Sequence, residues 1–186
     1  MSGWTKKRRV MQRYDLTAHL YDMRYAEEQA EKYKSAIRNF KTKKFGLVLD
    51  AGCGTGLLFD HIIYAAEAIV GLDISRKILL MARNRSRSLN VQLIRADVDT
   101  MPFKDAVFNC VFAVTVLQNI PDQLETLAEI KRVSKDNSII IVTGLKRIFS
   151  KRRFEALLKD SDLKITALEE GDGLRCYVAV CAKIRH

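Results

Sequence analysis

Short apolar runs and amphipathic segments alternate along the chain between residues 45 and 161. Short apolar runs bounded by polar or glycine residues indicate buried strands, and apolar residues recurring every three to four positions indicate helices. The predicted strands lie at 45–50, 68–73, 91–97, 108–114 and 138–144. The predicted helices lie at 57–67, 75–89, 121–133 and 150–161, with Pro121 in the first turn of its helix. This alternation is typical of an α/β fold that is doubly wound around a mostly parallel sheet.

The last two apolar runs, 163–170 and 175–184, break the alternation because no helical segment separates them. Gly171, Asp172 and Gly173 join the two runs, and this composition is typical of a hairpin turn. The sheet is therefore expected to end in a C-terminal antiparallel hairpin.

The N-terminal residues 1–13 are basic, with Lys6, Lys7, Arg8, Arg9 and Arg13 and no acidic residue. Such a charge run predicts a mobile arm or the start of a lid. From Glu27 onward apolar residues recur at helical spacing, which predicts an N-terminal helical cap that packs over the sheet and leads into a linker at 41–44. The apolar residues are Ala30, Tyr33, Ala36, Ile37 and Phe40. We therefore expect a single domain over 1–186, with the arm and cap at 1–44 and the α/β core at 45–186.

The composition supports a folded chain: 48% of the 186 residues are hydrophobic and 29% are charged, which excludes a disordered protein. Apolar runs such as Ile139 to Val142 are far shorter than the roughly 20 residues of a membrane-spanning helix, so we expect no membrane partner and a cytoplasmic location. The cysteines form no CxxC pair, which favours free thiols over disulfides or a metal site. They are Cys53, Cys110, Cys176 and Cys181.

The formal net charge of +10 adds a bias about the partner. Phosphates neutralised by a basic protein release counterions on binding, so this charge favours a polyanion such as RNA or DNA. Solvated lysines also serve solubility, and charge alone therefore does not identify the partner.

The sharpest motif is VLDAGCGTG at 48–56, a buried strand that runs into a loop with Gly52, Gly54 and Gly56. Glycines there let a ligand approach backbone amides at the start of a helix. The spacing is GxGxG. Leu57 occupies the position at which a dinucleotide fingerprint needs its third glycine, and this weakens an NAD or FAD interpretation.

Two further acidic residues end the next two strands. Asp73 can accept hydrogen bonds from ribose hydroxyls, and Asp97 can accept the exocyclic amine of adenine. Ile74 and Val98 follow these acids and can enclose a base between them. Three neighbouring strand ends therefore predict one nucleoside pocket.

In this order and spacing, the motifs resemble those of the class I S-adenosylmethionine-dependent methyltransferases over residues 48–184. The resemblance implies a Rossmann-like core with a seven-stranded sheet, in which the last strand is inserted antiparallel. It also implies that the protein uses S-adenosylmethionine and releases S-adenosylhomocysteine.

The same resemblance implies where each part of the cofactor binds. The methionine part is implied at Asp50 and the loop glycines, the ribose at Asp73, and the adenine at Asp97 and Val98. The segment 14–25 resembles the family's N-terminal segment that closes over the cofactor. Tyr14 and Tyr21 then contact the carboxylate or shield the sulfonium, or they simply pack a cap helix.

On the acceptor side, the fourth strand is expected to deliver Thr115 beside the cofactor and Gln118 and Asn119 toward the substrate. These side chains are neutral hydrogen-bonding groups that suit orientation of a substrate, so no catalytic residue is assigned. His19 in the cap is a further substrate-side candidate, although a lone histidine on a helix is more often a bystander.

The segment 115–120 lacks the Asn-Pro-Pro-Tyr or Asp-Pro-Pro-Tyr motif of family members that methylate adenine amines or glutamine. It resembles the corresponding stretch of methyltransferases that act on small molecules, tRNA wobble groups or guanine N7 of rRNA. The leading hypothesis is an RNA methyltransferase acting on tRNA or rRNA. The alternatives are a small-molecule or protein methyltransferase, and a non-catalytic cofactor-binding subunit. The resemblance also suggests a small zinc-binding activator subunit that pairs along the edge of the third strand.

Overall fold

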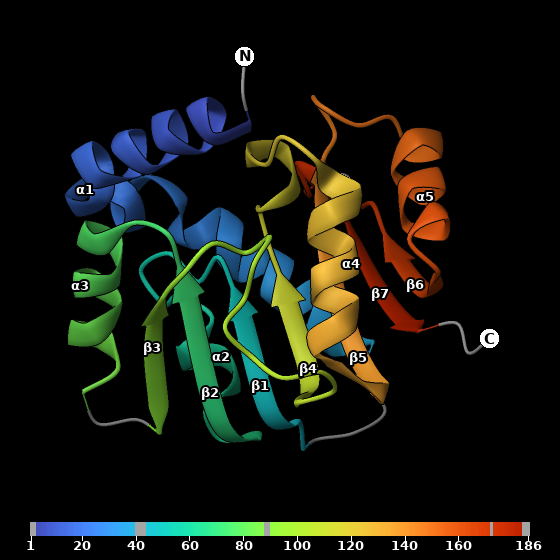
Figure 1. Cartoon of the computed structure of the whole chain (residues 1–186), viewed down its shortest axis with the longest axis horizontal. Helices are drawn as coiled ribbons and strands as arrows, with labels where there is room; N and C mark the ends of the chain where they lie inside the picture. Colours follow the sequence, from blue (N-terminus) through green and yellow to red (C-terminus); the bar gives the residue numbers. More distant parts are fainter. Residues whose placement is uncertain (1–2, 40–43, 88–89, 172, 184–186) are drawn as a thin grey trace.

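The computed structural model describes residues 3–39, 44–87, 90–171 and 173–183, which form one seven-stranded sheet flanked by helices (Figure 1). The strand order is β3-β2-β1-β4-β5-β7-β6. The strands are β1 (Gly46–Ala51), β2 (Ala66–Asp73), β3 (Val91–Arg95), β4 (Phe108–Ala113), β5 (Ser134–Leu145), β6 (Leu163–Glu169) and β7 (Cys176–Lys183). The helices are α1 (Gly3–Arg38), α2 (Phe59–Ile62), α3 (Arg76–Arg85), the 3-10 helix η1 (Leu117–Asn119), α4 (Gln123–Val133) and α5 (Lys151–Asp160).

The sheet topology confirms the predicted fold class. Strands β1 to β5 pair in parallel, and β7 is inserted antiparallel between β5 and β6. The carboxyl ends of β1, β2 and β4 therefore meet at one edge of the sheet, which is where open α/β sheets bind ligands. Asp172, at the predicted hairpin turn, lies outside the described residues.

Two apolar clusters cover the two faces of the sheet. One cluster joins the strands to α4 and α5 through buried side chains such as Ile130 and Phe154. The other joins them to the C-terminal half of α1, to α2 and to α3 through Ala36, Phe59 and Ala82. This double covering explains why the central strands are apolar on both sides.

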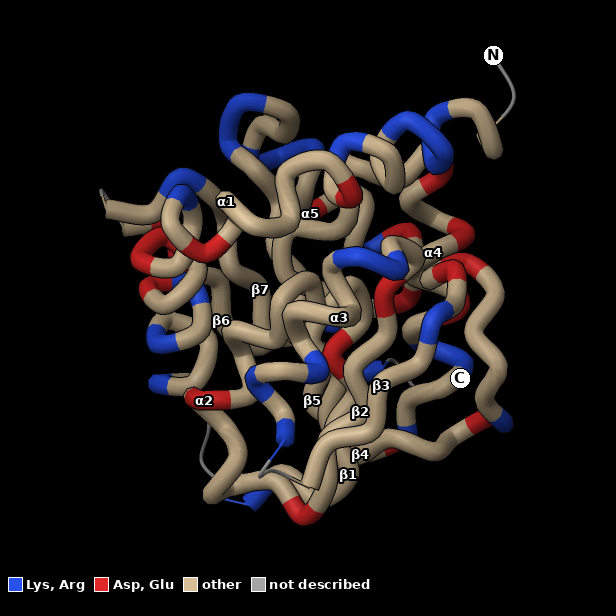
Figure 2. Tube along the Cα trace, turned by 90° about the vertical axis from the view of Figure 1, so that its left-hand side faces the viewer, with Lys and Arg blue, Asp and Glu red and all other residues tan. Residues whose placement is uncertain are grey.

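The N-terminus differs from the expectation of a mobile arm followed by a separate helix. Residues 3–38 form one continuous helix, α1, whose N-terminal part lies at the top of the molecule above the strand ends (Figure 2), whereas its C-terminal half packs on a face of the sheet. Two of its basic residues are fixed by contacts: Lys6 donates to the carbonyl of Ile120, and Lys7 binds two carboxylates. The prediction of a mobile arm was wrong because those partners lie more than 80 residues away along the chain. Phe40 and residues 41–43 of the predicted linker lie outside the described residues.

Two helix boundaries also need correction. The helix predicted at 57–67 shrinks to α2, because Ala66 and Glu67 already belong to β2, where Ala66 is paired with Gly46. Pro121 does not occupy the first turn of α4. It precedes the N-cap Asp122, whose carboxylate accepts the backbone N–H groups of Leu124 and Glu125.

All four cysteines are buried with free thiols. Among the described helices, none is long and apolar enough to span a bilayer.

Candidate active site

The glycine loop after β1 depends on backbone conformations that only glycine adopts without strain. Gly52, Gly54 and Gly56 have φ angles of 78°, 54° and 79°. The N–H groups of Gly52 and Cys53 both donate to the carbonyl of Leu72, at 2.7 and 2.9 Å. A Cβ atom on Gly52 would stand 2.7 Å from Val116 Cγ2. The loop is thereby pressed against the ends of β2 and β4.

Asp73, the last residue of β2, locks this loop in place. Its Oδ2 accepts the N–H of Gly54 at 3.1 Å, and its Oδ1 accepts the N–H of Ser75 at 2.8 Å. A carboxylate offers about four lone-pair positions, so both oxygens can still accept bonds from a ligand. Burial raises the pKa of Asp73 to about 6, against the effect of these backbone hydrogen bonds.

Asp50 is the buried acidic residue beneath the loop. It is 3% exposed, and no donor in the described part of the chain reaches its Oδ2. Burial, followed by the charge of Asp73, raises the pKa of Asp50 to about 8. An unpartnered buried carboxylate is costly, and a cationic ligand group nearby would relieve this cost.

An inner cavity lies at the strand ends beneath α1. It is lined by Lys7, Val10, Tyr14, Tyr21, Gly52, Gly54, Leu72, Asp73, Ile74, Ile78, Ala96, Asp97, Val98, Val114, Thr115, Val116, Asn119 and Ile120. Most of the predicted cofactor residues are in this set. Asp50 and Gly56 are not, and they shape the loop from behind.

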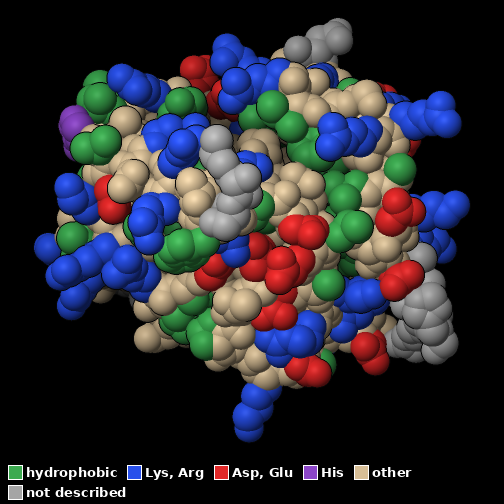
Figure 3. Space-filling view, turned by 45° about the horizontal axis from the view of Figure 1, so that its top comes forward, with side chains coloured by type: hydrophobic (Ala, Val, Ile, Leu, Met, Phe, Trp, Pro, Cys, Tyr) green, Lys and Arg blue, Asp and Glu red, His purple; other side chains and the backbone are tan. Residues whose placement is uncertain are grey.

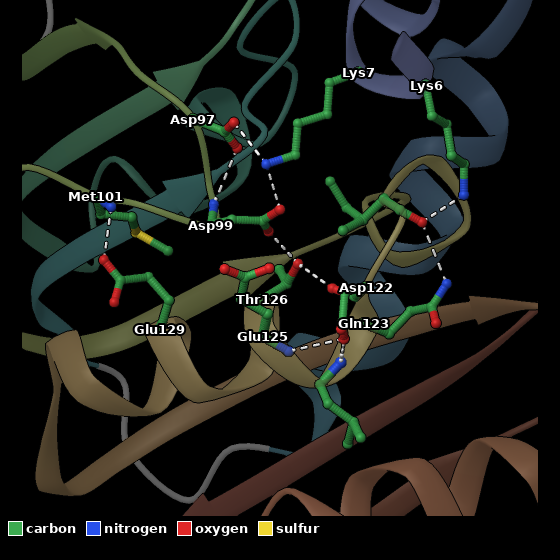
Figure 4. Close-up of polar contacts among 12 residues, drawn as sticks. Lys6, Lys7, Asp97, Asp99, Met101, Asp122, Gln123, Glu125, Thr126 and Glu129 are labelled. Atoms are coloured by element: carbon green, nitrogen blue, oxygen red, sulfur yellow. Dashed lines mark hydrogen bonds and ion pairs between the residues drawn. The ribbon is translucent and has the colours of Figure 1, made fainter. Parts of the chain in front are cut away.

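The cavity is closed at one end by a cluster that the sequence did not reveal (Figure 4). Lys7 Nζ lies 2.7 Å from Asp97 Oδ2 and 2.5 Å from Asp99 Oδ2. The hydroxyl of Thr126 donates to Asp99, and the N–H of Asp99 donates to Asp97. Partial burial lowers the pKa of Lys7, but the hydrogen bonds and charges of the two carboxylates outweigh it and the pKa is raised. The cluster fixes the first turns of α1 over the predicted adenine end.

Thr115 stands at the other end, in the left-handed backbone region with φ 64°. Its hydroxyl accepts a hydrogen bond from Lys32 Nζ at 3.0 Å and contacts the amide of Gln29. Lys32 is 1% exposed and is paired with Glu28 at 2.7 Å. The sequence analysis did not identify Gln29 and Lys32 as site residues, because a buried polar residue in a helix has no distinctive local pattern.

An outer cavity opens beyond Thr115, between α1 and the loop after β5. Its lining consists of Arg13, Tyr14, Thr17, Tyr21, Arg24, Tyr25, Glu28, Thr115, Gln118, Asn119, Leu145, Lys146, Arg147, Ile148 and Arg175. Tyr14, Tyr21, Thr115 and Asn119 line both cavities. We call these four the junction residues.

Of the three predicted substrate-side residues, Gln118 and Asn119 lie beside the junction residues or among them, and His19 does not. Asn119 donates to the hydroxyl of Tyr14 and to the carbonyl of Thr115, and Gln118 donates to the same carbonyl. Both line the outer cavity. His19 is exposed on α1 and lines neither cavity, so the structure does not bring it to the site.

Comparisons with known proteins agree with this geometry. The family profile described as a methyltransferase domain matches residues 49–142, slightly more than half of the chain. A protein named demethylmenaquinone methyltransferase from Staphylococcus epidermidis is 30% identical over 139 residues, which are 71% of this chain and 55% of that protein. The chain thus spans about half the length of the curated relatives it matches.

Solved structures share the fold at lower identity. A Haloferax volcanii methyltransferase, solved in complex with the Trm112 methyltransferase activator, superposes with a TM-score of 0.82 at 16% identity and covers 95% of this chain and 98% of that one. Magnesium protoporphyrin IX methyltransferase from Synechocystis, solved with bound S-adenosylmethionine, has a TM-score of 0.77 at 16% identity, with 96% and 97% coverage.

Proposed function

This chain belongs to the family of methyltransferase domains, and from that premise we propose that it transfers a methyl group from S-adenosylmethionine to a small molecule. The observation that carries the proposal is the meeting of two cavities at the junction residues. The inner cavity has the features of a nucleoside site, and the outer cavity gives a second molecule access to the same point.

The residues present fit S-adenosylmethionine. Asp73 would hold the ribose hydroxyls, Ile74 and Val98 would enclose the adenine, and Asp97 would accept its amine. At Gly54 an added Cβ would meet only Tyr21 and Ile78, at ordinary contact distances of 3.9 to 4.0 Å, so this glycine leaves room for a ligand beside the loop. Asp50 lies beneath a ligand whose methionine part is cationic, and that positive charge would favour the ionised form of its carboxyl group.

When bound, S-adenosylmethionine supplies an electrophilic methyl group on a positively charged sulfur. The protein's own task is to position the acceptor and exclude water. Burial raises the pKa of both Tyr14 and Tyr21, so their hydroxyls stay protonated at neutral pH. Together with Thr115 and Asn119 they form a neutral wall that orients an acceptor and does not remove its proton.

A small acceptor is favoured over RNA because α1 covers the inner cavity. Four α1 residues, Lys7, Val10, Tyr14 and Tyr21, line that cavity. With the inner cavity covered, the acceptor has to reach the junction residues through the outer cavity, and a free small molecule can enter it without the rest of a folded RNA having to fit against α1. An RNA acceptor remains a second candidate, favoured by the basic residues around the outer cavity, and the experiment below separates the two.

A partner for the free edge of the sheet is a further part of the proposal. Strand β3 is an edge strand whose Gln92 and Arg95 are exposed. A structurally similar methyltransferase was solved with a Trm112 activator. We propose that a small activator of this kind pairs with β3. Co-expression with such a protein should yield a stable complex. Proline substitution of Arg95 should prevent it, because the N–H of the next residue, Ala96, donates to β2 and the N–H of Arg95 therefore faces the free edge.

The proposed function is tested by methyl transfer. Purified full chain is incubated with methyl-labelled S-adenosylmethionine and, separately, with the RNA, protein and small-metabolite fractions of a cell extract. Label in the small-metabolite fraction, absent with Asp73→Ala, is the expected result. Ribonuclease-sensitive label would contradict a small acceptor and establish RNA. Absence of transfer despite cofactor binding, with and without an activator, would favour a non-catalytic subunit.

A further inference from the structure

The outer cavity has an excess of positive charge. Five basic residues and one acidic residue line it, and the acidic residue is Glu28. The carboxylate of Glu28 lies 2.7 Å from the buried Nζ of Lys32, so its charge is already balanced. Charges of opposite sign are also separated on the face shown in Figure 3, where acidic side chains gather near the middle and Lys and Arg side chains lie around them.

Two of the five basic residues have tasks within the protein. Arg13 donates to Asn119 Oδ1 at 3.0 Å and lies over the ring of Tyr14, 5.2 Å from its centroid. Lys146 donates to the carbonyl of Glu170 at 2.9 Å. These contacts shape the cavity wall and hold the loop after β5 beside it.

The other three, Arg24, Arg147 and Arg175, are available to a ligand. Within the described residues, the side chains of Arg24 and Arg147 make no hydrogen bond or ion pair. The guanidinium of Arg175 is 3.6 Å from Glu28, and 82% of its side chain is exposed. Arginine binds carboxylates and phosphates through two parallel hydrogen bonds, and it is the preferred residue for such anions.

A row of tyrosine rings continues from the junction residues into the outer cavity, which these arginines also line. The centroids of Tyr14 and Tyr21 are 5.9 Å apart, and those of Tyr21 and Tyr25 are 5.0 Å apart. Tyr25 lines the outer cavity but not the inner one, and it is 42% exposed. Aromatic rings that line a cavity bind planar molecules through stacking and edge contacts.

We propose that the acceptor is a planar molecule with a carboxylate or phosphate group. The tyrosine row would bind its ring, the arginines would bind its anionic group, and its nucleophilic atom would lie at the junction residues. This inference rests on the proposed function, because it specifies the class of acceptor for the same site. It makes Arg24, Arg147 and Arg175 specificity-determining residues, distinct from those that hold the cofactor.

The test uses two probes of nearly equal shape, 4-hydroxybenzoate and its uncharged counterpart 4-hydroxybenzamide. Each is titrated by calorimetry into the full chain saturated with S-adenosylhomocysteine. We expect the carboxylate to bind at least about tenfold more tightly than the amide. In an Arg147→Gln/Arg175→Gln variant this preference should fall to about twofold or less, as expected when two charged donors are lost. Arg83→Gln, which removes an exposed charge on α3 away from both cavities, is the matched control and should retain the preference.

The remaining outcomes distinguish this inference from the proposed function. If S-adenosylhomocysteine binds but the two probes bind equally, the inference that the acceptor carries an anionic group is wrong, whereas the proposed methyltransferase function is unaffected. Failure of S-adenosylhomocysteine to bind would overturn the proposed function itself. If short single-stranded RNA displaces 4-hydroxybenzoate, and the double variant weakens RNA far more than the probe, the arginines serve a polynucleotide and the small-molecule inference is wrong.

Discussion

The inner and outer cavities meet at the same four residues but are built in different ways. The inner cavity rests on backbone: positive-φ glycines, strand ends and the N–H groups fixed by Asp73. The outer cavity rests on long side chains that α1 and the loop after β5 contribute. A ligand common to a whole family can be bound by a conserved kind of backbone frame, whereas side chains on a cap can change without disturbing that frame. The cofactor and the acceptor should therefore respond to different substitutions.

The largest expected effect comes from Asp73→Ala, which removes the anchor of the glycine loop and the predicted ribose contacts. Two hydrogen bonds to a charged group contribute about 1.5 to 3 kcal/mol each, so affinity for S-adenosylhomocysteine should fall by at least about 100-fold. Calorimetry measures the affinity, and Asp160→Ala, an exposed acidic residue on α5, is the control. A loss below about threefold would contradict the ribose assignment.

Gly52→Ala tests whether the loop needs glycine. The substitution places a Cβ 2.7 Å from Val116 Cγ2 at a φ of 78°. Overpacking and backbone strain should together lower the free energy of unfolding by about 2 to 3 kcal/mol, measured by urea denaturation. Gly173→Ala meets no atom within 4 Å and should cost far less. Equal effects of the two substitutions would show that the loop tolerates a side chain.

The pH dependence of stability tests Asp50. The pKa of Asp50 is raised to about 8 in the folded chain, above the ordinary value of an unfolded aspartate. The folded state therefore binds an extra proton, and the stability that this proton contributes is fully present below the unfolded pKa and is lost as the pH rises through about 8. Asp50→Asn should remove this dependence and exceed the wild type in stability by at least about 1 kcal/mol at high pH. If the free energies of unfolding of the two proteins change in parallel between pH 5 and 9, the conclusion that Asp50 is buried without a partner would be wrong.

Lys7→Met tests the attachment of α1 to the inner cavity and has the smallest expected effect. Its side chain is 14% exposed, and its loss would leave Asp97 and Asp99 uncompensated. Because the pair is partly screened by solvent, we expect a cost of about 1 to 2 kcal/mol. Hydrogen exchange should show faster opening of the first turns of α1, while Lys34→Met, in an exposed pair on the same helix, should leave them unchanged. Unchanged exchange in Lys7→Met would contradict the role of this cluster.

The sequence predicted the inner cavity much better than the outer one, for a physical reason. Gly52, Gly54, Asp73 and Asp97 each follow a recognisable strand, so local pattern places them at one sheet edge. Lys7 and the residues it binds lie 90 and 92 positions apart along the chain, and nothing in the local pattern of α1 indicates which of its sides faces the sheet. The same is true of Arg147 and Arg175, whose meeting depends on tertiary packing.

The most direct test of the account is a crystal structure of the full chain with S-adenosylhomocysteine and 4-hydroxybenzoate. The account predicts the adenine between Ile74 and Val98, the ribose on Asp73, and the homocysteine on the glycine loop. It also predicts that the ligand sulfur faces Thr115 and Asn119, with the benzoate carboxylate near Arg147 and Arg175. A nucleoside bound outside the inner cavity, or a sulfur atom that points away from the outer cavity, would contradict the two-cavity arrangement from which the proposed function is derived.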